Sequence, residues 1–386
     1  MSVRKRTWEN DDGSRGESWV VNYTDSGGKR RLKTFKRRRD AESFENAVGV
    51  GVRAGLHVPD SQSVTIAEAG RLWLDSCEAA ELERATLVDY RRHLELHIVP
   101  LIGAVKLSQL TAPTVRSFAD ALRKGGTSPA MVRKLRVSLS AILTDALERG
   151  LVAQNIVKGL RKQRRGNEAD RHKGKLKVGV DIPTPDEVRA IIARLEGRWR
   201  PLFLTAIFTG LRASELPGLR WSDVDLTRGE IHVRQRADRY RVIGRPKSET
   251  SERSIPLLPM VVNVLREHRL ACPKGEQDLV FPNDAGNVYD HASIIKRGLI
   301  PLMVKAGLVD AKDKAKYTGL HALRHFYASW CINRRVDGGL ELPLKVVQAR
   351  LGHASIQMTA DTYGHLFPRG DDGAELAAAE RAFLAG

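Results

Sequence analysis

Residues 209–216 read Thr-Gly-Leu-Arg-Ala-Ser-Glu-Leu and follow an apolar segment, Leu202 to Thr209, that we expect to be helical. Glycine is typical of a helix C-terminus because it adopts the left-handed conformation at little cost. The segment therefore predicts a helix that ends at Gly210 and a turn that carries Arg212. An arginine after a glycine turn is most often a surface ion-pair partner, so this turn indicates a site only if other segments supply matching groups.

Three further segments supply such groups. They read Pro-Lys-Ser-Glu-Thr at 246–250, His-Ala-Leu-Arg-His at 321–325, and Leu-Gly-His at 351–353 with Tyr363 ten residues after the histidine. In this order the four segments closely resemble the tyrosine recombinases, or phage integrase family, over the whole of 181–386. The resemblance implies a site-specific DNA recombinase, an integrase that works through a covalent 3′-phosphotyrosine intermediate and a Holliday junction. Such an enzyme integrates and excises a mobile element such as a temperate phage.

The arginines and one histidine suit this chemistry by their residue types. Arginine can hold non-bridging phosphate oxygens in bidentate fashion, which is the role we expect for Arg212 and Arg324. His321 lies three residues before Arg324, on the same face of an expected helix. We therefore expect His321 to hold or transfer a proton near the attacking or re-attacking oxygen.

The resemblance assigns the remaining roles. It implies that Lys247 protonates the leaving 5′-oxygen, that His353 donates to a phosphate oxygen, and that Glu215 orients the cations. It also implies that Tyr363 is the nucleophile. His325 is either a structural histidine or a support for the site.

Two other tyrosines compete with Tyr363, because Tyr317 and Tyr327 both flank the His321–Arg324 segment. Tyr327 is expected to pack inward, whereas Tyr317 precedes the helix and could reach a phosphate. Tyr363 is preferred because it follows His353 at the family's spacing. The remaining four lie away from the charged segments: Tyr23, Tyr90, Tyr240 and Tyr289.

Composition predicts an acidic partner. The 386 residues include 64 Lys and Arg against 46 Asp and Glu, which gives a formal net charge of +18 and a pI near 10.0. Nucleic acid is the first such partner to consider, and a general solubility charge is the alternative. The chain has no GxxxxGK[ST] loop, which fits strand exchange without nucleotide hydrolysis, and we expect no cofactor and no metal.

The sequence also predicts a protein of the reducing cytoplasm, acting on the DNA of a bacterial host cell. Three cysteines, odd in number and far apart, argue against a disulfide scaffold and a structural zinc site. No apolar run approaches the roughly 18 residues that cross a membrane. The N-terminus lacks the apolar stretch of a signal peptide.

Residues 1–60 are expected to be an arm-type DNA-binding domain, a small β-sheet with one helix capped by Asp40. Between Lys29 and Arg39, eight of eleven residues are basic. A solvated hairpin face is the alternative, but so concentrated a stripe favours DNA contact. The expected contact residues are Lys29, Arg30, Arg31, Lys33, Lys36, Arg37, Arg38 and Arg39.

Residues 63–160 are expected to be a helical core-binding domain of four helices. Thr65 with Glu68 predicts a capping box, and Ser128 with Pro129 predicts the start of the last helix. The second helix is expected to stop before Pro100. His93 and His97, four residues apart, could bind a metal, but a surface pair is the preferred interpretation.

Residues 161–180 are expected to be a basic linker that follows the DNA backbone, with a plain disordered tether as the alternative. Its expected DNA contacts are Arg161, Lys162, Arg164 and Arg165. Residues 181–386 are expected to be a mixed α+β catalytic domain, with strands at 231–233, 240–243 and 254–257 and a hairpin tip at 246–252. The fold class is thus multidomain and mainly α, with small β-sheets.

The partners follow from the resemblance. It implies double-stranded DNA attachment sites of core and arm type, a homotetramer on DNA, a host DNA-bending protein and an excisionase. A type IB topoisomerase is the first alternative, because it shares the cleavage chemistry without partner exchange. A DNA-binding regulator without activity is the second alternative, and it would require a missing catalytic group.

Overall fold

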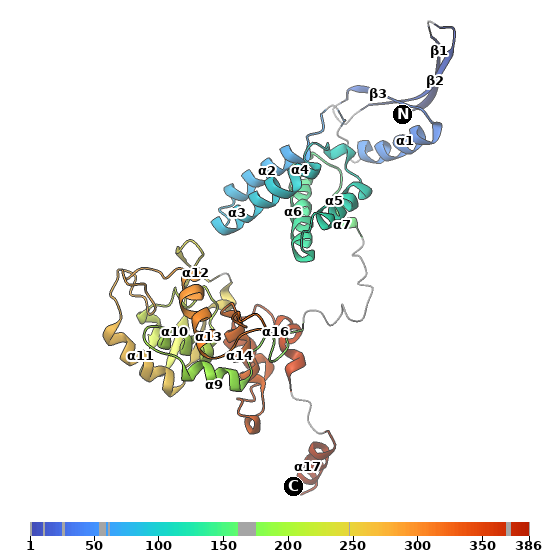
Figure 1. Cartoon of the computed structure of the whole chain (residues 1–386). Coiled ribbons are helices and arrows are strands. Elements are labelled where there is room, and N and C mark those ends of the chain that lie inside the picture. The colour runs from blue at the N-terminus through green and yellow to red at the C-terminus, as the bar shows by residue number, and fades with distance from the viewer. Residues whose placement is uncertain are drawn as a thin grey trace. The chain divides into compact units, whose positions relative to one another are not determined.

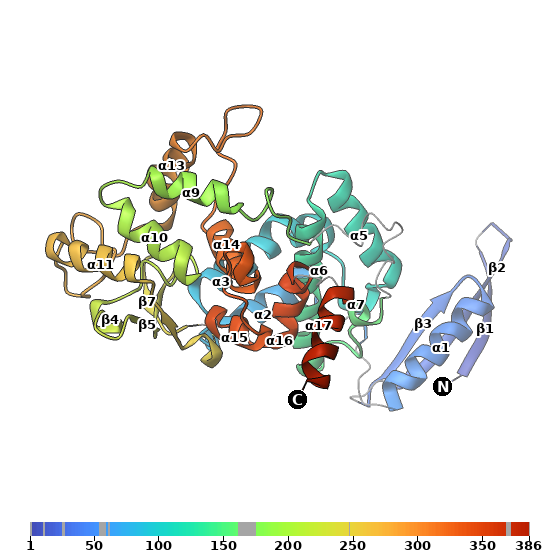
Figure 2. The same ribbon diagram turned by 90° about the horizontal axis from the view of Figure 1, so that it is seen from below.

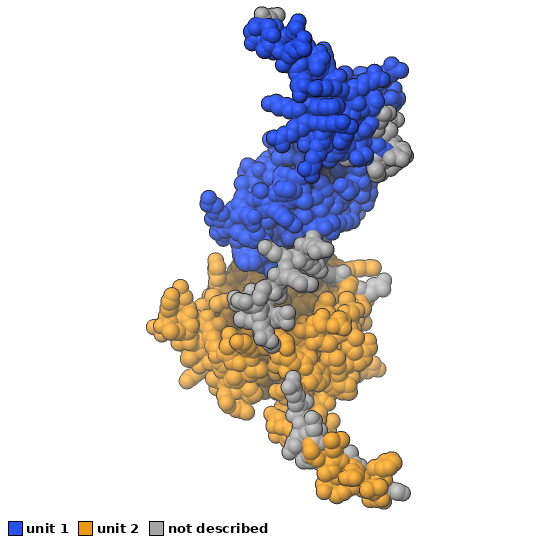
Figure 3. Space-filling model, turned by 90° about the vertical axis from the view of Figure 1, so that its right-hand side faces the viewer, with its two compact units in different colours: residues 1–164 blue, residues 165–386 orange. Residues whose placement is uncertain are grey.

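The computed structural model describes residues 2–10, 12–24, 28–53, 59–60, 62–160, 175–246, 248–367 and 372–385. The chain divides into two compact units, Met1–Arg164 and Arg165–Gly386, which are coloured separately in Figure 3. Both units are rich in helices and carry only small antiparallel sheets, so the expected fold class is confirmed. No helix in the described ranges is long and apolar enough to cross a membrane.

The first unit begins with a three-stranded sheet covered on one face by a helix (Figure 2). The elements are β1 (Ser2–Glu9), β2 (Arg15–Thr24), β3 (Arg30–Phe35) and α1 (Arg38–Arg53). Side chains that alternate along β2 reach the helix, and Val21 is fully buried there. The sequence predicted that Asp40 caps this helix. In the structure Asp40 is not the cap of α1 but lies within its first turn.

The rest of this unit is the expected helical module (Figure 1). Its helices are α2 (Ile66–Ala79), α3 (Arg84–His93), α4 (Val99–Ile102), α5 (Ala112–Lys124), α6 (Pro129–Glu148) and α7 (Ile156–Gly159). The Thr65 capping box and the Ser128 cap are both confirmed. The α6 residues Leu135, Leu139 and Ile142 are fully buried at the centre of the module.

Two sequence expectations about this module are wrong. The second helix does not stop before Pro100, because a π-helical segment (Leu94–Ile98) joins α3 to α4. Pro100 lies in the first turn of α4, where a missing N–H is tolerated. The proposed surface pair of histidines is also wrong, since His93 is buried and its Nδ1 lies 2.8 Å from Ser138 Oγ.

The second unit holds the four segments that define the site. Its helices are α9 (Pro185–Ala193), α10 (Trp199–Thr209), α11 (Pro259–Ala271), α12 (His291–Ser293), α13 (Ile300–Lys305), α14 (His321–Ile332), α15 (Leu344–Leu351), α16 (Ile356–Tyr363) and α17 (Asp372–Leu384). The capping box of α9 at Thr184 is confirmed. Helices α10 and α14 pack together, and α15 packs against both α14 and α16. The core therefore brings the end of α10, the start of α14 and the α15–α16 turn into one neighbourhood.

Two of the three expected strands of this unit, 231–233 and 254–257, are present to within one residue, whereas the strand expected at 240–243 is not formed over that range. The strands are β4 (Val224–Asp225), β5 (Glu230–Val233), β6 (Arg236–Ala237), β7 (Ile243–Gly244) and β8 (Arg253–Pro256). β8 pairs with β5, whereas β7 pairs with β6, so residues 246–252 connect two sheets and are not a hairpin tip. Tyr240 is not in a strand, because a turn with Arg241 at φ 67° precedes β7.

Candidate active site

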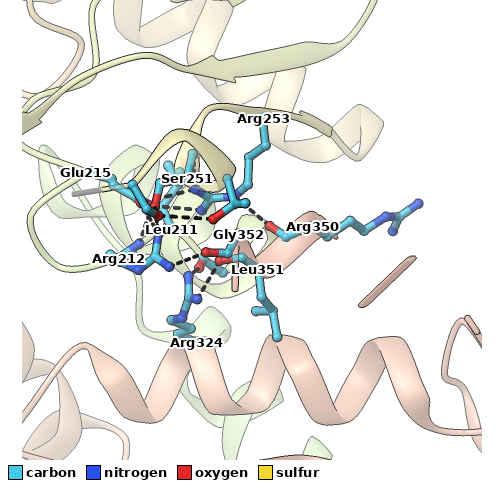
Figure 4. A network of polar contacts seen from close by, with 12 residues as sticks. Leu211, Arg212, Glu215, Ser251, Arg253, Arg324, Arg350, Leu351 and Gly352 are labelled. Atoms are coloured by element: carbon cyan, nitrogen blue, oxygen red, sulfur yellow. Dashed lines mark hydrogen bonds and ion pairs between the residues drawn. The ribbon is translucent and has the colours of Figure 1, made fainter. Parts of the chain in front are cut away.

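A buried carboxylate organises the cationic groups of the second unit. Glu215 is 3% exposed and lies in the turn after α10, which ends at Gly210 in the left-handed conformation. Its carboxylate accepts from the backbone N–H and the Nη1 of Arg212, at 2.8 and 2.7 Å, and from the Nη2 of Arg253 at 2.8 Å (Figure 4). Burial raises the pKa of Glu215, but the hydrogen bond and charge of Arg253, with those of Arg212, outweigh burial and hold the pKa at about 2.

Arg253 also ties β8 to the C-terminus of α15. Its Nε donates to the carbonyl of Arg350 at 2.7 Å, and its Nη1 donates to the carbonyl of Ser251 at 2.9 Å. Gly352 follows α15 with φ +64°, and a Cβ there would lie 2.9 Å from Arg253 Nη1. The close approach of this guanidinium therefore requires glycine at the turn before His353.

Arg324 joins the two glycine turns from the first turn of α14. It is 5% exposed, and its Nη1 and Nη2 each donate at 2.6 Å, to the carbonyls of Gly210 and Leu351. Arg212 donates to the carbonyl of the adjacent Gly352 (Figure 4). An arginine carries five N–H donors, so both side chains keep donors for phosphate oxygens. Burial, then the charge of Arg212, lowers the pKa of Arg324 to about 10, which leaves it protonated at neutral pH.

A cleft of about 460 Å³ opens beside Arg212. Its wall includes Arg212, His321, His291 and Gly352, and Met358 of α16. Desolvation, then the charge of Arg324, lowers the pKa of His321. A cleft with a guanidinium and two imidazoles in its wall suits an anionic group such as a phosphodiester.

Tyr363 lies at the end of α16 and is 1% exposed; it is not among the described residues that line the cleft. Its hydroxyl is 2.7 Å from Nδ1 of His325, and its ring stacks on His353 with 6.2 Å between centroids and 3° between planes. Nδ1 of His353 lies 2.9 Å from Thr359 Oγ1. Burial raises the pKa of Tyr363 to about 12, although the charge of Arg324 acts in the opposite direction.

Around this tyrosine two histidines have depressed pKa values. Burial, then the charges of His321 and Arg324, lowers the pKa of His325 to about 4. Burial, then Arg324 and Arg212, lowers the pKa of His353 to about 4. Both imidazoles are therefore neutral at pH 7 in the DNA-free chain.

The rival tyrosines are engaged elsewhere. Tyr317 donates to the carboxylate of Glu187 at 2.8 Å, and burial raises its pKa. Tyr327 packs beneath Gly210, where a Cβ would lie 2.4 Å from its ring, and burial raises its pKa as well. Among the three tyrosines, Tyr363 is the one whose described electrostatic interactions include Arg324, so this neighbourhood favours Tyr363.

Several expected site residues lie outside the described residues. They are Lys247 of the second segment and the linker residues Arg161, Lys162, Arg164 and Arg165. The structure brings together groups from the first, third and fourth segments, and Pro246 and Ser248 of the second segment line the same cleft. No cluster of three or more metal-ligating side chains occurs among the residues that the structure describes.

The basic stripe of the N-terminal sheet is divided between two faces. Lys33 lies opposite Val21 on the helix-covered face and pairs with Asp60 at 2.6 Å. Arg30 points to the open face, together with Arg4 and Arg6 of β1, which the sequence analysis did not select. At the start of α1, Arg38 pairs with Glu42 at 2.7 Å. The other stripe residues keep exposed or half-buried side chains: Lys29, Arg31, Lys36, Arg37 and Arg39.

Sequence reasoning missed Arg253 in the site itself. A signal was available, because Arg253 directly precedes the expected strand 254–257, and a strand that begins one residue earlier, as β8 does, places Arg253 and Ile255 on one face. Ile255 is fully buried, and an arginine on the same face must find a buried anion. The contact between His325 and Tyr363 joins helices far apart in sequence, so no local sequence pattern predicts it.

Comparison with known proteins finds similar sequences. The model of the phage integrase family matches residues 183–369. A protein of Caldanaerobacter subterraneus subsp. tengcongensis described as "Tyrosine recombinase XerC-like" is 28% identical over 374 residues, covering 89% of this chain and 90% of that protein. The integrase of Mycobacterium phage L5 is 25% identical, covering 85% of this chain and 84% of that protein.

Solved structures share the fold. The Tn1549 transposon integrase in complex with a circular intermediate DNA has a TM-score of 0.65 at 19% identity, over 83% of this chain and all of that chain. A lambda integrase tetramer bound to a Holliday junction has a TM-score of 0.56 at 17% identity, over 90% of this chain and 95% of that chain.

The buried pair of Glu215 and Arg253 predicts a pH-dependent stability. Glu215 titrates below its usual pKa, so its contribution is complete above about pH 5 and is lost as the pH falls toward 2. A shift of this size corresponds to about 3 kcal/mol at pH 7. Glu215→Gln should therefore be less stable than wild type at pH 7, with a difference that shrinks below pH 5, in urea unfolding followed by tryptophan fluorescence.

A matched control is Asp284→Asn, which breaks the ion pair between Asp284 and Arg198. The side chain of Asp284 in this pair is 85% exposed. Exposed ion pairs contribute little to stability because solvent screens them, so this variant should resemble wild type across this pH range. Equal stability of Glu215→Gln and wild type at pH 7 would contradict the role given to the buried carboxylate.

Proposed function

We propose that the chain is a tyrosine recombinase of the phage integrase family, whose model matches residues 183–369, and that it integrates and excises a mobile element such as a temperate phage. The proposal is supported by the grouping of Arg212, which lines the cleft, with the buried Arg324, whose charge acts on both Arg212 and Tyr363. Exchange of DNA strands without an energy source needs a covalent intermediate that conserves the phosphodiester bond energy. A buried tyrosine on which the charge of Arg324 acts suits that requirement.

In the proposed mechanism, Tyr363 Oη attacks the scissile phosphorus and the 5′-oxygen leaves. Arg212 and Arg324 stabilise the charge on the non-bridging oxygens, which is the main demand of phosphoryl transfer. His353 donates to a phosphate oxygen, and Lys247 gives the leaving oxygen its proton. The 5′-hydroxyl of a partner strand then attacks the phosphotyrosine and restores the phosphodiester bond.

Glu215 and His321 have supporting roles in this proposal. Glu215 fixes Arg212, because it binds both the backbone N–H and the guanidinium of that residue. His321 lies in the cleft wall, where it can exchange a proton with the oxygen that leaves or re-attacks.

The DNA-binding surfaces are assigned by charge. The N-terminal sheet would bind an arm-type site through its exposed basic residues, and the helical module would bind the core site with the catalytic domain. The segment with Arg161, Lys162, Arg164 and Arg165 would follow the backbone between them. The assembly would be a homotetramer on two sites, because two pairs of strands are exchanged.

The accessory partners remain part of the proposal. A host DNA-bending protein would bring arm and core sites of one DNA molecule within reach of one protomer, since bending short DNA is costly. An excisionase would set the direction of the reaction.

The direct test is recombination between two plasmids that carry the repeated DNA flanking the integrated element. Wild type should form the joint product in EDTA and without nucleotide, because the proposed reaction uses only side chains of the protein. Tyr363→Phe should bind the same DNA and form no product, as measured by gel shift and by product length. Relaxation of a plasmid without these repeats would instead favour a topoisomerase, and binding without cleavage by wild type would favour a regulator.

Deletion of residues 1–60 tests separately, in the same assay, the binding of core-type and arm-type DNA sites. The shortened chain should still cleave a core site but should fail to assemble on long attachment DNA, because it loses the avidity of linked binding modules. Recombination of long sites at the wild-type rate would contradict the arm-binding proposal.

The proposed role of Lys247 as general acid can be tested by changing the leaving group of the DNA substrate. Lys247→Ala should slow cleavage while leaving affinity for the core site nearly unchanged. A substrate with sulfur in place of the 5′-leaving oxygen should restore its rate, because a thiolate departs without a proton. The control is Lys305→Ala, an exposed lysine paired with Glu196, which should cleave both substrates like wild type. Equal impairment of Lys247→Ala on both substrates would count against the general acid.

A further inference from the structure

The hydroxyl of Tyr363 has one described hydrogen bond, and it is not with the histidine that the sequence analysis chose. Tyr363 Oη and His325 Nδ1 are 2.7 Å apart, and their ring centroids are 5.8 Å apart. His321 lies one helical turn away, with its ring centroid 6.3 Å from that of His325. The imidazole closest to the attacking oxygen is therefore that of His325.

We propose that His325 is a further catalytic residue, whose Nδ1 accepts the phenolic proton as Tyr363 attacks the scissile phosphate. This inference rests on the proposed function of Tyr363 as the nucleophile. In this proposal His325, and not His321, accepts the proton of the attacking oxygen. His321 keeps the role of exchanging a proton with the 5′-oxygen that leaves or re-attacks in the cleft.

Burial of the phenol makes an internal acceptor necessary. Tyr363 is 1% exposed, so bulk water does not surround its hydroxyl. The Nδ1 of His353, the other imidazole against this ring, is 2.9 Å from Thr359 Oγ1, and its ring lies parallel to the tyrosine ring. Among the described side chains, His325 is thus the one positioned to receive the proton.

The charge state of His325 suits an acceptor. The titratable groups that act on it are His321 and Arg324 of its own helix, Asp181, and His353 and Tyr363 from the α15–α16 region. Burial and the neighbouring cationic groups lower the pKa of His325 to about 4, so the imidazole is neutral at pH 7 and one ring nitrogen carries a lone pair. A hydroxyl at 2.7 Å can donate to that nitrogen.

The proton cannot move before the phosphate reacts, because the pKa of Tyr363 is raised to about 12. It moves as the new bond forms, since the phenolic oxygen becomes far more acidic when it bonds to phosphorus. The negative charge of bound DNA also raises the pKa of nearby imidazoles and makes His325 a better acceptor than in the free chain.

The proposed step balances. The O–H bond of Tyr363 breaks and its proton passes to His325 Nδ1, while Oη forms a bond to phosphorus. The bond from phosphorus to the 5′-oxygen breaks, and that oxygen takes a proton from Lys247. In the rejoining step a 5′-hydroxyl attacks phosphorus and gives its proton to the neutral amine of Lys247, while His325 returns its proton to the departing phenolic oxygen. No oxidant, metal or nucleotide enters the step.

The test combines His325→Ala with a more acidic nucleophile. A nicked duplex with the element's repeated sequence is cleaved in single turnover by the full chain, with either tyrosine or 3,5-difluorotyrosine at position 363. With tyrosine, His325→Ala should form the covalent adduct about 100-fold more slowly than wild type, which is within the range for loss of a general base. Its affinity for the duplex should stay within about threefold.

Difluorotyrosine should recover at least about tenfold of the rate lost by His325→Ala, because a phenol that ionises more readily depends less on an acceptor. His321→Ala should be slow with both nucleophiles and gain no comparable recovery. The matched control is His232→Ala, since His232 has the same 2.7 Å contact from Nδ1 to a hydroxyl, that of Ser254, outside the site. This control should cleave like wild type.

Two results would overturn the inference. Equal loss of rate in His325→Ala with tyrosine and with difluorotyrosine would show that the histidine only supports the structure. Faster cleavage by His325→Ala would show that the contact withholds the tyrosine. Failure of wild type to form any adduct with Tyr363 would instead reject the proposed function, so the two failures are distinguishable.

Discussion

The carboxylate of Glu215 is the anion on which the cationic site depends. Arg212 and Arg253 both bind it directly, and Arg324 lies close enough for its pKa to respond to the same group. Guanidinium groups held together in a protein interior repel one another, and burial adds the loss of hydration. One buried carboxylate compensates part of that cost. Arg212 also lines the cleft, where in the proposed function a phosphodiester would supply the second anion. The same pair also fixes the geometry, since Arg253 connects the Arg212 turn with the turn before His353.

Much of this arrangement follows from sequence, and the failures have physical causes. Caps at Thr65, Ser128 and Thr184 were predictable, because each depends on side chains within three residues of the helix start. The stop before Pro100 was wrong, since a π-helical segment places that proline where no N–H is needed. His93 was wrongly expected at the surface, because its hydroxyl partner lies 45 residues away on another helix and no local pattern indicates it.

The site divides in the same way. Residue types and the order of four segments were enough to group Arg212, Arg324 and Tyr363, because each segment carries its own local pattern. The partners of those residues are carbonyls and side chains from distant turns, which no local pattern specifies. Arg253 and the hydroxyl contact of His325 belong to this second class.

The central claim is that Tyr363 becomes covalently attached to DNA. A nicked suicide duplex that lets the 5′ fragment diffuse away should trap a 3′-phosphate adduct on the wild-type chain. Protease digestion and mass spectrometry should place the adduct on the peptide that contains Tyr363. An adduct on the peptide of Tyr317 or Tyr327, or one that persists in Tyr363→Phe, would contradict the account.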